Sequence, residues 1–469
     1  MAERMETMKK NYQKLLCALL IAMLILSVFT ACSTPVHSDS TLNGIALSDF
    51  SIVYAEDPYG YNTRAAQYIQ AEIRSRTGLN LPVIKDSDAA AGNSEIVVGD
   101  TSRAISSQLE PVSGKMQFTI LAEDSRIALE GEYFVIAAAA YYFVQTYIPE
   151  NNYHAEIPKE VTTLDPIAEQ PDHYIMLIGD GMGVNQTRLF DVMQNNRDYS
   201  HGETAFFGYY LPYAGFSRTD SLTGTTDSAA GGTALACGIK TINYYVGQDQ
   251  NHDPVQSLTE LAGSRGMATA VMSTETMTGA TPSAFSAHAD DREDKSDIII
   301  SQSELQKQYG TIIDCGYDIY TYNGVAKICD KVRKTLDTLG QDPDGFFMMY
   351  EEAHIDKHCH NNDIDSTFNA VTRFNRVIGV VMEWVFYHPN TLVLITADHE
   401  TGGLTDQDGS FVYTSEEHTS ADVPVFAYGV GGELFHGTVV ENIQIPMTIA
   451  SLWGVHDFGD QSNFQPLTK

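Results

Sequence analysis

The stretch HYIMLIGDGMG, residues 173–183, decides the fold of the larger part of this chain. It opens with an apolar run, residues 173–178, whose length fits a β-strand buried on both faces. The run ends at Asp180, where flanking glycines let the backbone approach closely and suit a carboxylate that binds metal. A glycine-rich turn with an aspartate also occurs as a plain turn, so both interpretations stay open here.

Two later stretches repeat this arrangement. Residues 346–350 are apolar and precede Glu351, and residues 390–397 precede Asp398 and His399. Near-continuous apolar strands that alternate with helices predict a three-layer αβα fold with a central, mostly parallel sheet for residues 172–469. Ligands bind such sheets beyond the carboxyl ends of the strands. These carboxylates and the histidine are therefore expected to converge on one crevice.

The segment TTDSAAGGTA, residues 225–234, supplies a candidate nucleophile. Ser228 is predicted to begin a helix, whose free N–H groups and partial positive charge favour an alkoxide and a bound phosphate. The small residues that follow allow tight packing around a bulky anion. The alternative is that Asp227 or Ser228 serves only as an N-cap.

The segment EEAHIDKHCH, residues 351–360, contains candidate metal ligands. Asp356 and His360 are four residues apart, so on a helix they share a face and can hold one metal ion. Segments rich in histidine and acid also occur as solvated loops. His418, just before the strand-like residues 423–428, would mean little alone.

Together these segments resemble the alkaline phosphatase family, in its motif order, from about residue 174 to residue 428. The resemblance implies hydrolysis of phosphate monoesters, with Ser228 as the nucleophile and Arg292 clamping two phosphate oxygens through its planar fork. It also implies two zinc ions and one magnesium ion. The implied ligands are Asp356, His360 and His418 for the first zinc ion, Asp180, Asp398 and His399 for the second, and Asp180, Thr281 and Glu351 for magnesium.

Gly279 departs from the family pattern, which usually has an aspartate or histidine two residues before Thr281. We therefore expect weak magnesium binding, and we expect Lys357 to lack its usual acidic neighbour. The segment between His399 and His418 is short compared with larger members, so the family's dimer interface is not assumed.

Three other functions are weighed against this interpretation. A phosphodiesterase or nucleotide pyrophosphatase of the same superfamily would share the two-zinc core without needing Arg292 and Glu351 in these positions. A sulfatase is disfavoured because Ser228 is not followed by the proline and arginine that accompany formylglycine formation. A non-catalytic cell-surface binding protein would be expected to have lost ligands or the nucleophile.

The whole chain has 469 residues, which suggests two folded units. Its 61 acidic and 28 basic residues give a net charge of −33, which argues against general affinity for nucleic acid or anionic lipid. An anionic substrate would then need local positive charge, which bound metal ions could supply.

Residues 1–32 have the layout of a lipoprotein-type signal peptide, with early lysines and an apolar run over residues 15–28. Cys32 follows a small residue and is predicted to be lipidated, which would anchor an exported protein to a bacterial membrane. An ordinary secretory signal or a signal anchor is the alternative. Residues 33–42 are predicted to form a polar linker.

Residues 43–165 alternate strand-like and helix-like stretches and predict a small α/β accessory domain. Its expected role is that of a spacer, with contact to carbohydrate or cell wall as the alternative. Cys315 and Cys329 are candidates for a disulfide, although no cysteine spacing here indicates a disulfide framework.

Overall fold

The computed structural model describes residues 40–88, 90–109, 116–148, 154–195, 210–319, 321–407 and 410–468. The predicted signal peptide, the lipidation site Cys32 and most of the linker lie outside these ranges. In the part of the chain that is described, no helix has both the length and the hydropathy needed to cross a membrane.

The chain forms two compact units. The smaller unit comprises the described residues within 1–110, 119–130 and 139–162, and the larger unit those within 111–118, 131–138 and 163–469.

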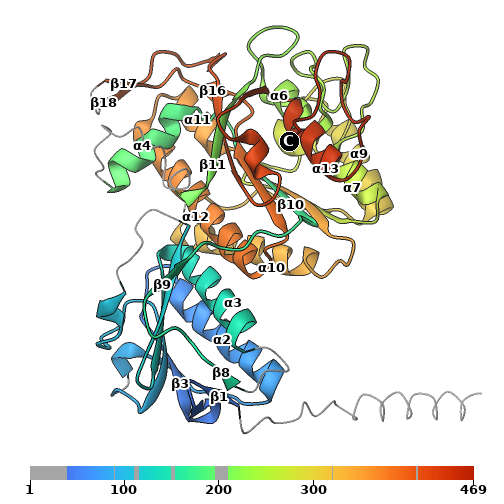
Figure 1. Cartoon of the computed structure of the whole chain (residues 1–469). Helices are drawn as coiled ribbons and strands as arrows, with labels where there is room; N and C mark the ends of the chain where they lie inside the picture. Colours follow the sequence, from blue (N-terminus) through green and yellow to red (C-terminus); the bar gives the residue numbers. More distant parts are fainter. Residues whose placement is uncertain are drawn as a thin grey trace, which may run out of the picture. The chain divides into compact units, whose positions relative to one another are not determined.

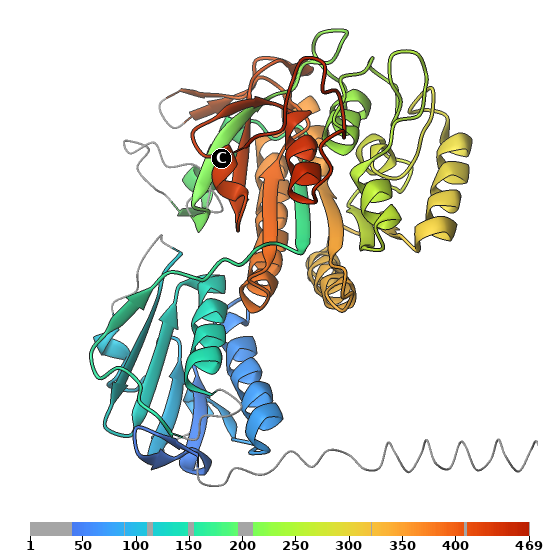
Figure 2. The ribbon, with the colours of Figure 1, turned by 45° about the vertical axis from the view of Figure 1, so that its right-hand side comes forward.

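The smaller unit is built on a six-stranded sheet with the order β4-β3-β5-β7-β6-β9. These strands are β3 (Phe50–Tyr54), β4 (Val83–Lys85), β5 (Ser94–Val98), β6 (Phe118–Glu123), β7 (Arg126–Gly131) and β9 (Thr162–Leu164). β3 pairs in parallel with both β4 and β5, and β5 with β7. Figures 1 and 2 show α2 (Tyr61–Thr77) and α3 (Ile136–Tyr147) side by side against this sheet. A separate three-stranded sheet consists of β2 (Ile45–Ala46), β1 (Thr41–Leu42) and β8 (His154–Ala155).

The larger unit contains an eight-stranded sheet with the order β13-β12-β14-β10-β15-β20-β11-β21. Its strands are β10 (His173–Gly179), β11 (Tyr213–Arg218), β12 (Ala268–Ser273), β13 (Ile312–Cys315), β14 (Phe346–Glu352), β15 (Thr391–Thr396), β20 (Val423–Tyr428) and β21 (Val439–Glu441). Within the described sheet, β20 alone runs antiparallel to its neighbours, and the other pairings are parallel. The predicted α/β fold with a mostly parallel central sheet is therefore confirmed.

Two groups of helices accompany this sheet (Figures 1 and 2). In one group α12 packs against the other members and against β10, and in the second group α6 contacts α7, α8 and α13 while α7 contacts α9. The first group is α4 (Val184–Asn195), α10 (Tyr322–Leu339), α11 (His354–His360) and α12 (Ile364–Tyr387). The second group is α6 (Ser228–Cys237), α7 (Leu258–Ser264), α8 (Ala280–Ala284), α9 (Lys295–Tyr309) and α13 (Gln444–Leu452).

The apolar run in β10 is explained by burial on both of its faces. Tyr174, Met176 and Ile178 belong to a core cluster that includes residues of α6, α7 and α13. Ile175 and Leu177 are equally buried, and because alternate side chains of a strand point to opposite faces they lie on the other side of the sheet.

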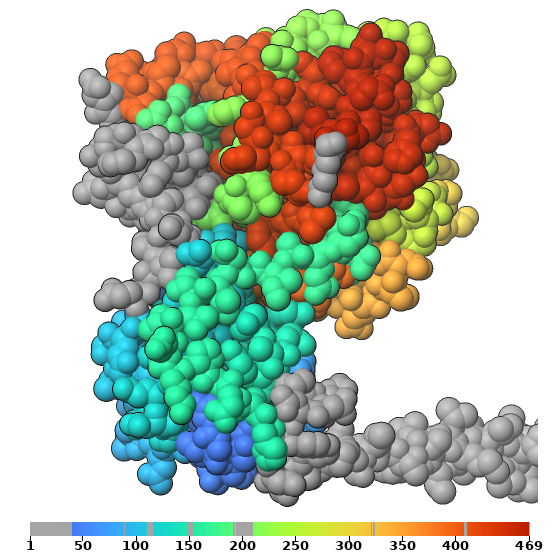
Figure 3. Space-filling model, in the orientation of Figure 1, coloured from blue at the N-terminus to red at the C-terminus, as the bar shows by residue number. Residues whose placement is uncertain are grey.

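The C-terminal segment is an integral part of the larger unit. Figure 3 shows this segment, drawn in red, forming much of one face of the unit. Ile445 and Ile449 of α13 lie in the same core cluster as the strand residues. Elsewhere in the larger unit Cys315 carries a thiol, so the candidate disulfide with Cys329 is not formed.

Candidate active site

Three carboxylates meet at one edge of the central sheet. β10 lies between β14 and β15, and the register pairs Ile178 with both Glu351 and Thr396. Because the three strands are parallel, their carboxyl ends coincide, and Asp180, Glu351 and Asp398 come together there. These side chains are 6%, 1% and 0% exposed, respectively.

Burial gives these carboxylates unusual protonation behaviour. Burial first, and then the charge of Asp398, raises the pKa of Asp180 well above its usual value. Burial and the charge of Asp356 raise the pKa of Asp398 to about 7. Among the described residues, Asp180 Oδ1 and Asp398 Oδ2 have no hydrogen-bond partner. Buried polar atoms normally have partners, and a divalent cation would satisfy both oxygens and keep the carboxylates ionised.

His399 brings a nitrogen to these oxygens. Its Nε2 atom lies 3.5 Å from Asp180 Oδ1, 3.3 Å from Asp398 Oδ2 and 3.2 Å from Ser228 Oγ. Burial lowers the pKa of His399 well below its usual value, so the ring is neutral. The four side chains implied for the second metal site and the nucleophile thus converge on one point.

Thr401 determines which nitrogen of His399 carries the proton. Its hydroxyl donates a hydrogen bond to Asp356 Oδ1 at 2.5 Å. The hydroxyl oxygen of Thr401 also lies 3.2 Å from His399 Nδ1. Because its own proton is already donated to Asp356, it can only accept from Nδ1, so Nδ1 carries the proton. His399 Nε2 is left with a lone pair directed at Ser228 and the carboxylates.

Asp356, His360 and His418 form a second group. Asp356 Oδ1 lies 3.3 Å from His360 Nε2 and 3.5 Å from His418 Nε2, and the two Nε2 atoms are 3.1 Å apart. Each Nδ1 atom instead donates to a backbone carbonyl, of Glu416 for His360 and of Thr226 for His418. Two imidazole nitrogens this close cannot both be protonated, and a shared cation fits their lone pairs.

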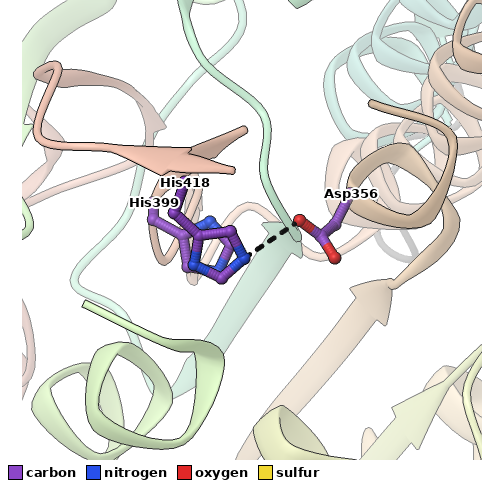
Figure 4. Close-up of side chains that lie close together, drawn as sticks. All are labelled: Asp356, His399 and His418. Atoms are coloured by element: carbon purple, nitrogen blue, oxygen red, sulfur yellow. Dashed lines mark ion pairs between the residues drawn. The ribbon is translucent and has the colours of Figure 1, made fainter. Parts of the chain in front are cut away.

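The two groups share a boundary at His399. The His399 and His418 rings stack with their centroids 3.6 Å apart, and Asp356 faces them in Figure 4, paired with His418. Ligand atoms of Asp356, His399 and His418 lie within 4.8 Å of one another, as do those of Asp180, Asp398 and His399. Two adjacent sets of nitrogen and carboxylate ligands are the donor types that zinc prefers.

The helix α6 presents Ser228 to this centre. Asp227 is its N-cap, and the Asp227 side chain accepts a hydrogen bond from the N–H of Ala230 at 3.0 Å. The capping role therefore belongs to Asp227, and the Ser228 hydroxyl is directed at His399. Gly231 allows the close approach of the helix, because a Cβ atom there would lie 2.9 Å from the carbonyl oxygen of Asp398.

Arg292 lies next to Asp227, the residue that precedes Ser228. Its Nη1 atom pairs with Asp227 Oδ2 at 3.0 Å, and its side chain is 26% exposed. Asp227, Arg292, Tyr244 and His418 help to line an open pocket of about 450 Å³. A phosphate in this pocket would have both Arg292 and His418 in the surrounding wall.

The side chains implied for magnesium also lie together. Thr281 in α8 is buried, and its hydroxyl oxygen has no hydrogen-bond partner among the described residues. Ser273 donates a hydrogen bond to Glu351, which lowers the pKa of that carboxyl group. Burial is the larger effect and raises that pKa to about 7. The charge of Glu351 in turn raises the pKa of Asp180, which places all three implied ligands in one neighbourhood.

The expectation that Lys357 lacks an acidic neighbour is wrong. Its ammonium group forms an ion pair with Glu275. Gly279 makes this arrangement possible, because a Cβ atom at Gly279 would lie 2.3 Å from Glu275 Cγ. Glu275 therefore occupies the space that a side chain at position 279 would need.

Comparison with known proteins gives consistent matches. A family model for alkaline phosphatase matches residues 173–319 and 323–415, which include every predicted site residue except His418. Alkaline phosphatase 4 of Bacillus subtilis is 30% identical over 284 residues, covering 49% of this chain and 62% of that protein. Alkaline phosphatase 3 of the same organism is 28% identical over 344 residues, covering 60% of this chain and 74% of that protein.

Solved structures agree with these sequence matches. The alkaline phosphatase from the Antarctic bacterium TAB5 is 25% identical, with a TM-score of 0.53 over 61% of this chain and 98% of that chain. A variant of that enzyme, with the same identity and TM-score, has Mg bound in its M3 site.

Proposed function

The chain belongs to the alkaline phosphatase family, and we propose that it hydrolyses phosphate monoesters by transferring the phosphoryl group to Ser228 and then to water. The observation that carries this proposal is the position of Ser228 Oγ. It lies at the start of α6, 3.2 Å from His399 Nε2, with Arg292 held on the neighbouring Asp227.

We assign the metal ligands as follows. Asp356, His360 and His418 would hold one zinc ion, Asp180, Asp398 and His399 a second, and Asp180, Thr281 and Glu351 a magnesium ion. When bound, such ions supply Lewis-acid charge that offsets the negative charge of the phosphoryl group.

The chain's own residues act in the first step. The Ser228 hydroxyl loses its proton as Oγ attacks phosphorus, and a bond forms between these two atoms. The ester oxygen leaves with its electron pair and takes up a proton, so the step consumes no proton overall. The free N–H groups and partial positive charge at the start of α6 favour the Ser228 alkoxide. Arg292, oriented by Asp227, binds two of the equatorial phosphoryl oxygens through its planar fork.

The second step restores the nucleophile. Water attacks the phosphoserine, the bond between Ser228 Oγ and phosphorus breaks, and the serine oxygen regains a proton as phosphate leaves. Arg292 contacts the same phosphoryl oxygens in both steps. A diester would put an ester substituent on one of these oxygens, which favours monoesters over the phosphodiesterase alternative.

A comparison of two substrates tests this proposal. The purified chain with zinc and magnesium should hydrolyse p-nitrophenyl phosphate far faster than bis(p-nitrophenyl) phosphate. Ser228→Ala should lower kcat for the monoester about 10³-fold or more, because it removes the attacking oxygen. Ser221→Ala, in a turn outside the metal centre, is the matched control and should keep full activity. Equal or faster diester hydrolysis by the wild type would refute the monoesterase assignment.

For localisation we propose export and lipid anchoring through Cys32, supported by the layout of residues 1–32. Metabolic labelling with an alkyne fatty acid should mark the wild type and not Cys32→Ser, and label on both proteins would contradict the anchor. For the smaller unit we propose a spacer role, with carbohydrate or cell-wall contact as the alternative.

A further inference from the structure

A second pocket lies in the larger unit, between the beginning of α10, α11 and the first half of α12. Its volume is about 320 Å³. None of the residues assigned as metal ligands lines it, and neither Ser228 nor Arg292 does. The pocket is therefore distinct from the one beside the nucleophile.

One face of α12 supplies the polar side of this pocket. Ser366, Asn369, Arg373 and Arg376 all line it. These positions are three or four residues apart, so on a helix their side chains project in the same direction. The face presents a hydroxyl, an amide and two guanidinium groups to one cavity.

Arg373 is fixed in place by the central sheet. Its Nε atom donates to Glu352 Oε2 at 2.7 Å, and its Nη2 atom donates to Glu352 Oε1 at 2.5 Å. Both residues are buried, with 5% and 0% exposed surface. The charge of Arg373 is thus balanced by the end of β14, and its position in the pocket wall is preset.

Arg376 is in a different situation. Its Nε atom is buried, and no described residue accepts a hydrogen bond from it. No ion pair to Arg376 occurs within the described ranges, whereas Arg333 of α10 pairs with Glu383 at 3.3 Å. A buried donor without an acceptor is costly, so an acceptor brought by a ligand would stabilise this arginine.

The remaining lining matches a small anion with an organic part. Thr321 and His358 add polar groups, whereas Ile319 and Val325 form an apolar wall. No carboxylate is found among the described residues that line the pocket, although the chain carries a net charge of −33. Arg376 thus gives the pocket a guanidinium charge that no carboxylate of the described lining balances.

We propose that this pocket binds a phosphate-type oxyanion, either inorganic phosphate or the phosphate group of a small organic ester, without hydrolysing it. Arginine forks match phosphate oxygens in pairs, and Arg376 has donors to spare. The volume lies within the range of small-molecule sites. This proposal rests on the pocket alone and stands whether or not Ser228 is the nucleophile.

Binding stoichiometry tests the proposal. Isothermal titration of the full chain, saturated with zinc and magnesium, would use inorganic phosphate and, separately, phenylphosphonate, which phosphatases cannot hydrolyse. We expect two sites per chain for at least one of these probes. Arg376→Ala should lose one site or weaken it at least tenfold, and Arg333→Ala, an arginine outside the pocket, should keep both.

The results of these titrations either support or contradict the proposed second binding site. A second site for phenylphosphonate alone would identify an organic ester as the ligand, and a second site for both probes would identify the phosphate group itself. The proposal would be overturned if Arg376→Ala bound both probes with the same number of sites and the same affinities as the wild type, whether the wild type has one site or two. If Arg376→Ala fails to fold by circular dichroism, Arg376→Lys and Asn369→Ala replace it, and unchanged binding in both would equally overturn it.

Discussion

At the scale of single residues, hydrogen bonds from the Nδ1 atoms orient three imidazole rings of the candidate site. His360 and His418 donate from Nδ1 to backbone carbonyls, and His399 donates from Nδ1 to Thr401. Each ring therefore turns its Nε2 atom toward a carboxylate. Such supporting hydrogen bonds orient metal ligands and typically matter almost as much as the ligands themselves.

The ion pair between Glu275 and Lys357 leads to a prediction about magnesium. The charge of Asp180 acts on the Lys357 ammonium group, so a Lys357 released from Glu275 would compete with a cation for Asp180. Glu275→Ala should raise the magnesium concentration needed for half-saturation several-fold in zinc-loaded protein. Titration calorimetry with magnesium measures this directly.

The controls for this prediction separate charge from folding. The double variant Glu275→Ala with Lys357→Ala should recover most of the lost affinity, because the competing ammonium group is gone. Glu304→Ala removes an exposed carboxylate of α9 and should have no effect. Unchanged magnesium binding in Glu275→Ala would show that the ion pair does not influence the site.

The sequence identifies most of the site residues because they obey a local rule. Asp180, Glu351 and Asp398 each follow an apolar strand, and the parallel sheet then brings them together. Glu275 follows the strand Ala268–Ser273 in the same way and could have been found by the same signal. Thr401 could not, since its role depends on where Asp356 lies after folding.

At the scale of elements, the sequence predicts where a strand lies better than it predicts the residues at which the strand begins and ends. The prediction for residues 423–428 matches β20 completely. The strand-like run predicted over residues 346–350 continues instead to Glu352, because an apolar pattern does not fix where strand pairing ends. The ion pair between Glu352 of β14 and Arg373 of α12 cannot be predicted from the sequence, because it depends on how the helix packs on the sheet.

The ion pair between Arg373 and Glu352 leads to a prediction about stability. Arg373→Met would leave the buried Glu352 carboxylate without its two charged hydrogen bonds, which should lower the free energy of unfolding by about 3–5 kcal/mol. Chemical denaturation monitored by circular dichroism measures this loss. Arg376→Met, on the same face of α12 but without an ion pair among the described residues, should cost much less. Equal losses in the two variants would contradict the assigned role of Glu352.

At the scale of the whole molecule, the buried carboxylates link metal binding to stability. Burial raises the pKa of Glu351 to about 7, from an ordinary value of 4.5. When a chelator removes the metal ions, the Glu351 carboxyl group therefore stays protonated to a higher pH in the folded state than in the unfolded state. The contribution of Glu351 to stability must fall as pH rises between these two values.

The variant Glu351→Gln removes this titration. In chelator, its free energy of unfolding relative to wild type should improve as the pH rises from about 5 to about 7.5. With zinc and magnesium present, the wild type should instead have the higher free energy of unfolding, because its Glu351 carboxylate can bind metal and the amide of the variant cannot replace it. Glu304→Gln, which changes an exposed carboxylate, is the control. A difference that does not change with pH would show that Glu351 is ionised without metal.

The central claim is that the phosphoryl group passes through Ser228. The most direct measurement is to mix the zinc- and magnesium-loaded chain with a phosphate monoester at low pH, quench in acid, and locate phosphate by mass spectrometry of peptides. We predict a phosphorylated peptide that contains residues 225–234, with the modification on Ser228 and none in Ser228→Ala. A turnover-competent enzyme that leaves Ser228 unmodified, or that carries phosphate on another residue, would contradict the account.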